Sequence, residues 1–137
     1  MVRSDKMIRV KIVPEDSRKV AKVIIINEDD HVLMLKRSDY VDKFAGQWDL
    51  PGGHIQVGED FEVGMKREVK EETDLSVGEC NYVGKTENLD FYWCEYPDKP
   101  IKLSHEHTQF RFFPKQDLDP QGKFEKMALK ALEMKND

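Results

Sequence analysis

Three glutamates that lie close together in the sequence are the residues best suited to do chemistry in this chain. Glu68, Glu71 and Glu72 fall within the run KREVKEE at 66–72, which is predicted to be helical. At about 100° per residue, their side chains span an arc of roughly 100°. Carboxylates so close together repel one another and raise one another's pKa values. A hard divalent cation such as Mg²⁺ or Mn²⁺ would relieve that repulsion.

The same run also fits a solvent-exposed helix face without a bound ion. Glu62 and Lys66 are four residues apart, as are Arg67 and Glu71, and both pairs could form ion pairs along such a face. Taken alone, a run of this kind more often has that structural role. The preceding segment, 51–53, favours the chemical role, because Pro-Gly-Gly predicts a backbone turn that few side chains could replace.

Turn and helix together resemble the Nudix box of the Nudix hydrolase family (MutT-like). That pattern is Gly, five residues, Glu, seven residues, Arg-Glu, an apolar residue, any residue, Glu-Glu, any residue, Gly and an apolar residue. The positions that fit are Gly53, Glu59, Arg67, Glu68, Val69, Glu71, Glu72 and Leu75. Asp74 replaces the last glycine, which normally ends the helix in a left-handed conformation that Asp tolerates. We therefore expect a small stability cost and intact chemistry.

The resemblance implies a fold, a cofactor and a reaction. Nudix domains are α/β/α sandwiches with a mixed β-sheet, and the helix of the box carries a metal site. The expected cofactor is Mg²⁺, with Mn²⁺ as a possible substitute. The expected reaction is hydrolysis of a diphosphate linkage in a nucleoside diphosphate derivative, which releases a nucleoside monophosphate.

The resemblance also assigns the metal ligands. Glu68, Glu71 and Glu72 are expected to bind the metal together with the main-chain carbonyl of Gly53.

Further roles follow from the resemblance for residues around these ligands. Arg67 and Glu59 form the pair expected to orient the carboxylates. Glu106, beyond the box, is the candidate for an extra ligand or the general base. Arg37 matches an arginine that often follows the second strand of the family and would contact a substrate phosphate.

Tyr92 is the candidate for stacking on a base. It lies 17 residues after Leu75, and a tyrosine at about that distance resembles the diadenosine polyphosphate branch of the family. His105 and His107 are two residues apart and lack a clear third ligand, so we expect surface residues rather than a zinc site.

Two other functions stay open. A Nudix fold can sense a nucleotide without cleaving it, although such proteins usually lose glutamates that this chain keeps. An RNA 5′-end pyrophosphohydrolase would need a basic track near the site. Residues that could supply one are Lys11, Arg18, Lys19, Lys22, Lys36, Arg37 and Lys43. A homodimer is also possible.

The elements that position these residues follow from the pattern of apolar side chains. Strands are predicted over 7–13, over 20–26 and 32–35 as a hairpin, as one or two strands in 75–96, and over 101–103 and 108–113. Residues 38–58 are predicted to be irregular. One helix is predicted over 59–73, with Phe61, Met65 and Val69 facing the core. A second runs to Met134 from Asp119, its predicted N-cap. The prediction is an α/β (α+β) fold in a single domain, 1–137.

Composition limits the classes of partner. The 137 residues are 39% hydrophobic and 36% charged, with a net charge of −5, which is typical of a globular domain without a dominant basic stripe. We therefore expect a small-molecule nucleotide partner, and no nucleic acid except an RNA 5′ end. Cys80 and Cys94 are too few for a disulfide framework and are expected to be reduced, partly buried thiols. No apolar run is long enough for a membrane span, and we expect a cytoplasmic protein.

Overall fold

The architecture is a mixed sheet with a helix on each side, in a computed structural model that describes residues 19–39 and 45–137. The predicted strand over 7–13 lies outside these ranges. Described elements, in chain order, are β1 (Lys19–Ile26), β2 (Val32–Arg37), β3 (Trp48–Asp49), β4 (Gly52–Ile55), α2 (Phe61–Thr73), β5 (Asn81–Thr86), β6 (Leu89–Glu95), β7 (His107–Phe113), the 3-10 helix η1 (Lys115–Asp117) and α3 (Lys123–Lys135).

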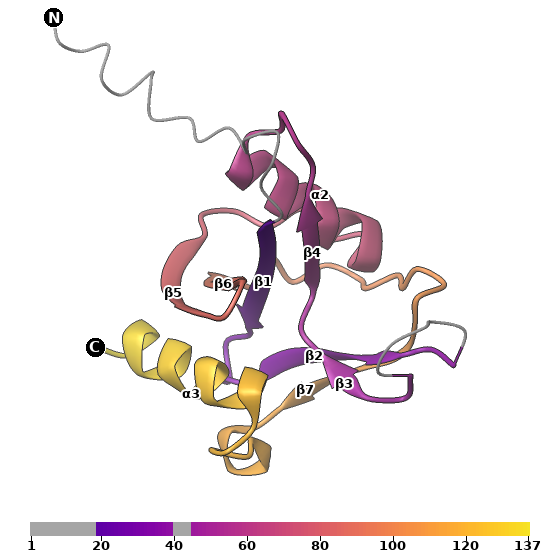
Figure 1. Ribbon diagram of the computed structural model, residues 1–137. Coiled ribbons are helices and arrows are strands. Elements are labelled where there is room, and N and C mark those ends of the chain that lie inside the picture. The colour runs from indigo at the N-terminus through magenta and orange to yellow at the C-terminus, as the bar shows by residue number, and fades with distance from the viewer. Residues whose placement is uncertain (1–18, 40–44) are drawn as a thin grey trace, which may run out of the picture.

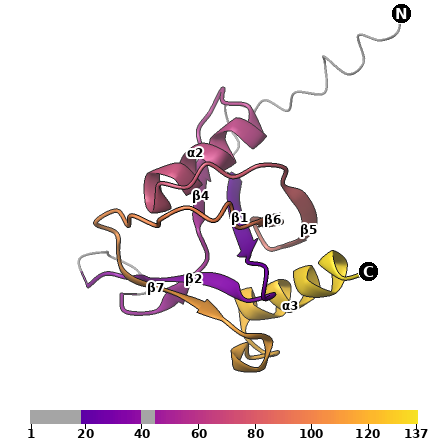
Figure 2. The same cartoon turned by 180° about the vertical axis from the view of Figure 1, so that it is seen from behind.

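Strand β1 lies inside the sheet and divides the core into two layers. Successive side chains of a strand point to opposite faces. Ile24 and Ile26 accordingly join the apolar cluster under α3, whereas Val23 and Ile25 join the cluster under α2. Figures 1 and 2 show the two helices on opposite sides of the sheet. The predicted α/β/α sandwich with a mixed sheet is therefore confirmed, since β1 pairs in parallel with β6 and antiparallel with β2 and β4.

Strands β1 and β2 diverge after their shared turn. They are paired only at Ile26 and Val32, next to that turn. The segment 48–55 bridges the gap, because β3 pairs with β2 and β4 then pairs with β1. The prediction that 38–58 is irregular was wrong for this segment. Strands of two and four residues are too short to display an alternating pattern.

Helix α2 starts two residues later than predicted and ends where predicted. Asp60 is its N-cap, and the Asp60 carboxylate accepts a hydrogen bond from the Val63 amide at 3.0 Å. Asp74 ends the helix in the left-handed region, with φ of 65°, so the expected conformation of this residue is confirmed. The predicted core stripe is also confirmed, because Met65 and Val69 are buried and Phe61 packs against the same cluster.

Other boundaries differ from the predictions. Residues 75–96 contain two strands, β5 and β6, which pair antiparallel. Residues 101–103 form no strand: their apolar side chains pack on the α2 cluster, but the Lys102 amide donates to the Thr73 carbonyl at the end of α2. Helix α3 begins at Lys123, not near Asp119. The Asp119 carboxylate instead accepts a hydrogen bond from Gln121 in the preceding turn.

Gly52 provides a stringent test of how β4 is joined to β1. Its φ is +129°, and a Cβ there would overlap the main-chain carbonyl oxygen of Ala21. We predict that Gly52→Ala lowers the free energy of unfolding by about 3 kcal/mol, from backbone strain plus steric overlap. Gly58→Ala is the matched control, because Gly58 has φ of +82° with open space around it. It should cost only about 1 kcal/mol. Urea denaturation measures both, and equal losses would contradict the close approach.

Candidate functional site

Arg67 organises the carboxylates of α2. Its guanidinium contacts both oxygens of Glu59, from Nε at 2.7 Å and from Nη2 at 3.0 Å. Its Nη1 lies 3.0 Å from a carboxylate oxygen of Glu68 and 3.0 Å from one of Glu71. The hydrogen bond from Arg67 holds the pKa of Glu59 below its usual value. The structure therefore brings together the Arg67–Glu59 pair that the sequence predicted.

Glu72 is the most deeply buried carboxylate of the three predicted ligands. It is 7% exposed, and one of its oxygens accepts a hydrogen bond from the Gly52 amide at 2.9 Å. Burial raises the pKa of Glu72 to about 8, although the Gly52 hydrogen bond and the charge of Lys22 act in the opposite direction. This carboxylate therefore lies in a site where a positive charge would be strongly stabilised.

Glu68 reaches the same turn. A Cβ at Gly53 would overlap the Glu68 carboxylate, so a larger residue there would displace that carboxylate from its present position beside the turn. Burial raises the pKa of Glu68, while its hydrogen bond with Arg67 lowers it. The carboxylates of Glu68 and Glu72 thus both meet the turn at 52–53, where the sequence predicted a main-chain carbonyl ligand.

The oxygen donors fit a hard divalent cation, but the side chains are not all in place. Within residues 19–39 and 45–137, no group of three or more His, Cys, Asp or Glu is gathered around one point. Glu71 is 58% exposed and is held by Arg67. Glu71 therefore does not gather with Glu68 and Glu72 around one point in this structure.

A buried ion network next to these glutamates was missing from the sequence-based predictions. Asp49 is 5% exposed and accepts hydrogen bonds from Lys22 Nζ at 3.0 and 3.1 Å and from Arg37 Nη1 at 3.2 Å. Lys22 could have indicated this network from the sequence, because it is a single cation in the apolar run 20–26. A buried lysine side chain requires a partner of opposite charge. Lys22 and Arg37 of the predicted basic track thus converge, whereas Lys11, Arg18 and Lys43 lie outside the described residues.

The loop that carries Glu106 is fastened to the end of α2. The Ser104 amide donates to the main-chain carbonyl of Glu72 at 3.2 Å, and the Glu106 carbonyl accepts from the Ser38 amide at 2.8 Å. The Glu106 carboxylate is exposed, and its charge contributes to raising the pKa of Glu68, after the larger effect of burial. The structure therefore brings Glu106 into the neighbourhood of the predicted ligands.

The two histidines of this loop differ. His105 is exposed, as predicted. His107 is only 4% exposed, so its prediction as a surface residue was wrong. The reason is that His107 begins β7 opposite Arg37 and lies inward of the loop. Burial lowers the pKa of His107, and neither ring nitrogen has a hydrogen-bond partner.

Tyr92, on β6, packs among aromatic side chains. Its ring packs against Phe61 at 5.7 Å and against Tyr82 at 5.3 Å between centroids. Burial raises the pKa of Tyr92 to about 12. Its neighbour Trp93 packs on the opposite face, in the cluster under α3.

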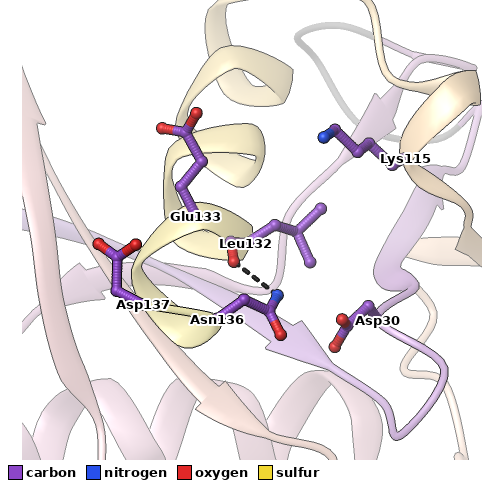
Figure 3. A pocket seen from close by; sticks show the side chains of 6 residues that line it. All are labelled: Asp30, Lys115, Leu132, Glu133, Asn136 and Asp137. Atoms are coloured by element: carbon purple, nitrogen blue, oxygen red, sulfur yellow. Dashed lines mark hydrogen bonds between the residues drawn. The ribbon is translucent and has the colours of Figure 1, made fainter.

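A pocket lies at the other end of the molecule, beside the C-terminal end of α3 (Figure 3). None of the predicted site residues lines it. Its lining residues are Asp30, Lys115, Leu132, Glu133, Asn136 and Asp137.

No helix in the described part of the chain is long and apolar enough to cross a bilayer.

Curated relatives share part of the chain. It is 43% identical over 64 residues to a putative 8-oxo-dGTP diphosphatase of Bacillus subtilis, a match that covers 47% of this chain and 40% of that protein. It is 43% identical over 51 residues to an ADP-ribose pyrophosphatase of Methanocaldococcus jannaschii, which covers 37% and 29%. The chain thus matches less than half the length of each of these two relatives.

Similarity in fold extends over most of the chain. The crystal structure of a MutT protein from Methanosarcina mazei Go1 matches with a TM-score of 0.68 and 25% identity, over 86% of this chain and 94% of that one. A family model described as the NUDIX domain matches residues 16–133. That range includes the turn at 52–53, helix α2 and the Glu106 loop, so the chain belongs to the NUDIX family.

Proposed function

We propose that the chain catalyses Mg²⁺-dependent hydrolysis of a diphosphate linkage in a nucleoside diphosphate derivative and releases a nucleoside monophosphate. The observation that carries the proposal is the buried Glu72 carboxylate, held by the Gly52 amide beside Glu68. A carboxylate in that position favours a bound cation strongly. Relatives named as a diphosphatase and a pyrophosphatase support the reaction class.

The proposed metal ligands are Glu68, Glu71, Glu72 and the main-chain carbonyl of Gly53. Mg²⁺ bound there would neutralise negative charge on the diphosphate oxygens. Arg67, fixed by both oxygens of Glu59, would keep the Glu68 carboxylate oriented.

Two further residues have proposed roles in the reaction. Glu106 would accept the proton of the attacking water, because its exposed carboxylate lies close enough to Glu68 to affect the Glu68 pKa. Arg37 would bind a substrate phosphate. Its side chain is 24% exposed, and Lys22 would continue to pair with Asp49 if the guanidinium turned toward a phosphate. A stacking role for Tyr92 stays a prediction, since its half-buried ring already contacts Phe61.

Product analysis over a substrate panel tests the proposal. The panel contains ADP-ribose, diadenosine polyphosphates, nucleotide sugars, normal and oxidised nucleoside triphosphates, and a short triphosphorylated RNA. We expect Mg²⁺-dependent release of a monophosphate from one class of nucleoside diphosphate derivative, and no release in the presence of EDTA. Cleavage of the RNA alone, with steep salt dependence, would favour the RNA-end alternative. Nucleotide binding without any cleavage would favour the sensor.

Substitution of single glutamates tests the assignment of the site. We predict that Glu71→Gln and Glu72→Gln each lower turnover by about 10²- to 10⁴-fold, because each removes a negative charge that holds the cation. The folded state should persist, as measured by circular dichroism. Glu62→Gln is the matched control on the same helix, because its carboxylate is 59% exposed and pairs only with Lys66 among the described ion pairs. Near-normal turnover in both site variants would contradict the assignment.

A further inference from the structure

We propose that Cys80 and Cys94 form a site of reversible oxidation, in which a hydroperoxide converts the two thiols into an intramolecular disulfide. The site goes beyond the proposed hydrolysis and uses none of its residues.

Cys80 immediately precedes β5, and the register of β5 with β6, extended by one residue, brings it opposite Cys94. β5 and β6 are antiparallel, with Tyr82 opposite Tyr92 and Asn81 opposite Trp93. One further step along the same register pairs Cys80 with Cys94. Opposed residues in antiparallel strands have Cα atoms about 4.5 or 5.5 Å apart, and both values lie within the range that a disulfide spans. The backbone therefore requires little movement for the bond to form.

Side-chain contacts agree with this register. The rings of Tyr82 and Tyr92, one pair further along on the same face, are in contact. Cys94 is fully buried in the cluster under α2, and the partly buried Cys80 packs against that cluster. Each thiol shifts the pKa of the other, which agrees with two neighbouring side chains, and the Cys80 thiol donates a hydrogen bond to the Gly78 carbonyl at 3.6 Å. Both are free cysteines in this structure, so the contact is between reduced thiols.

The two thiols have different surroundings, which divides their roles. A hydrogen bond from the Cys94 thiol lowers the pKa of Cys80, and the nearby Lys66 ammonium lowers it further against the effect of burial. Cys80 is also the less buried of the two. Since the thiolate is the nucleophile, Cys80 is the residue that a hydroperoxide reaches first, and Cys94 is the resolving thiol.

The proposed chemistry balances with one hydroperoxide consumed. The Cys80 thiolate attacks a peroxide oxygen, the O–O bond breaks, and the displaced oxygen leaves as water or an alcohol after taking up a proton. Cys94 then loses its proton and attacks the sulfur of the Cys80 sulfenic acid. The S–O bond breaks, water leaves and the S–S bond forms. Both sulfurs are oxidised and the peroxide is reduced.

Treatment of the full chain with hydrogen peroxide tests the site. We expect both thiols to disappear together in a thiol titration, with a mass loss of about 2 Da for the two hydrogens. Peptide mapping should find the peptides of Cys80 and Cys94 linked, and a dithiol reductant should restore both thiols. The chain should run as a monomer on a non-reducing gel.

The Cys94→Ala variant isolates the first step. Without the resolving thiol, Cys80 should accumulate as a sulfenic acid that dimedone traps, and the mass loss should be absent. The proposal is overturned if the wild-type chain gains oxygen at Cys80 while Cys94 stays free. It is equally overturned if the cysteines form only intermolecular disulfides.

Discussion

The hydrogen bond from the Gly52 amide to the Glu72 carboxylate joins helix α2 to the sheet where β4 pairs with β1. It requires a glycine at 52, because the chain there approaches the backbone of β1 too closely for any side chain. It also requires that a carboxylate be buried, which is costly without a compensating charge. The position of the helix and the proposed affinity of the site for a cation thus depend on the same buried carboxylate.

Divergence of β1 and β2 creates a polar interior beside that hydrogen bond. The segment 48–55 fills the opening and brings Asp49 between Lys22 of β1 and Arg37 of β2. Buried charges persist only when they are paired, and here the pairing holds both diverging strands. On the helix side, Arg67 forms ion pairs with the carboxylates of Glu59, Glu68 and Glu71. The site is therefore a set of carboxylates, each held by a fixed donor.

Local sequence patterns predicted those parts of the site that depend on one helix. Arg67 and Glu59 were found because their spacing belongs to a recognisable motif, and Asp74 was expected in its left-handed conformation from its place in that motif. The Lys22–Asp49 ion pair was not predicted, because its partners are 27 residues apart and meet only where two strands diverge. No local pattern records that divergence.

The same distinction explains the errors in the fold. Ile101 and Leu103 do face the core, but their backbone pairs with the end of α2 rather than with a strand, which the alternation of apolar residues cannot reveal. Cys80 and Cys94 are 14 positions apart in the sequence and look unrelated, yet they flank Asn81 and Trp93, which are paired between β5 and β6.

Binding of Mn²⁺, followed by the electron paramagnetic resonance signal of the free ion, tests the central claim most directly, because it requires no knowledge of the substrate. Titration of the wild-type chain should remove the free-ion signal saturably, and Mg²⁺ should restore the signal by competition. Glu72→Gln should weaken the binding by about tenfold or more, while Glu62→Gln leaves it unchanged. Equal Mn²⁺ affinity in the wild type and Glu72→Gln would contradict the account, because the buried carboxylate would then have no part in holding a cation.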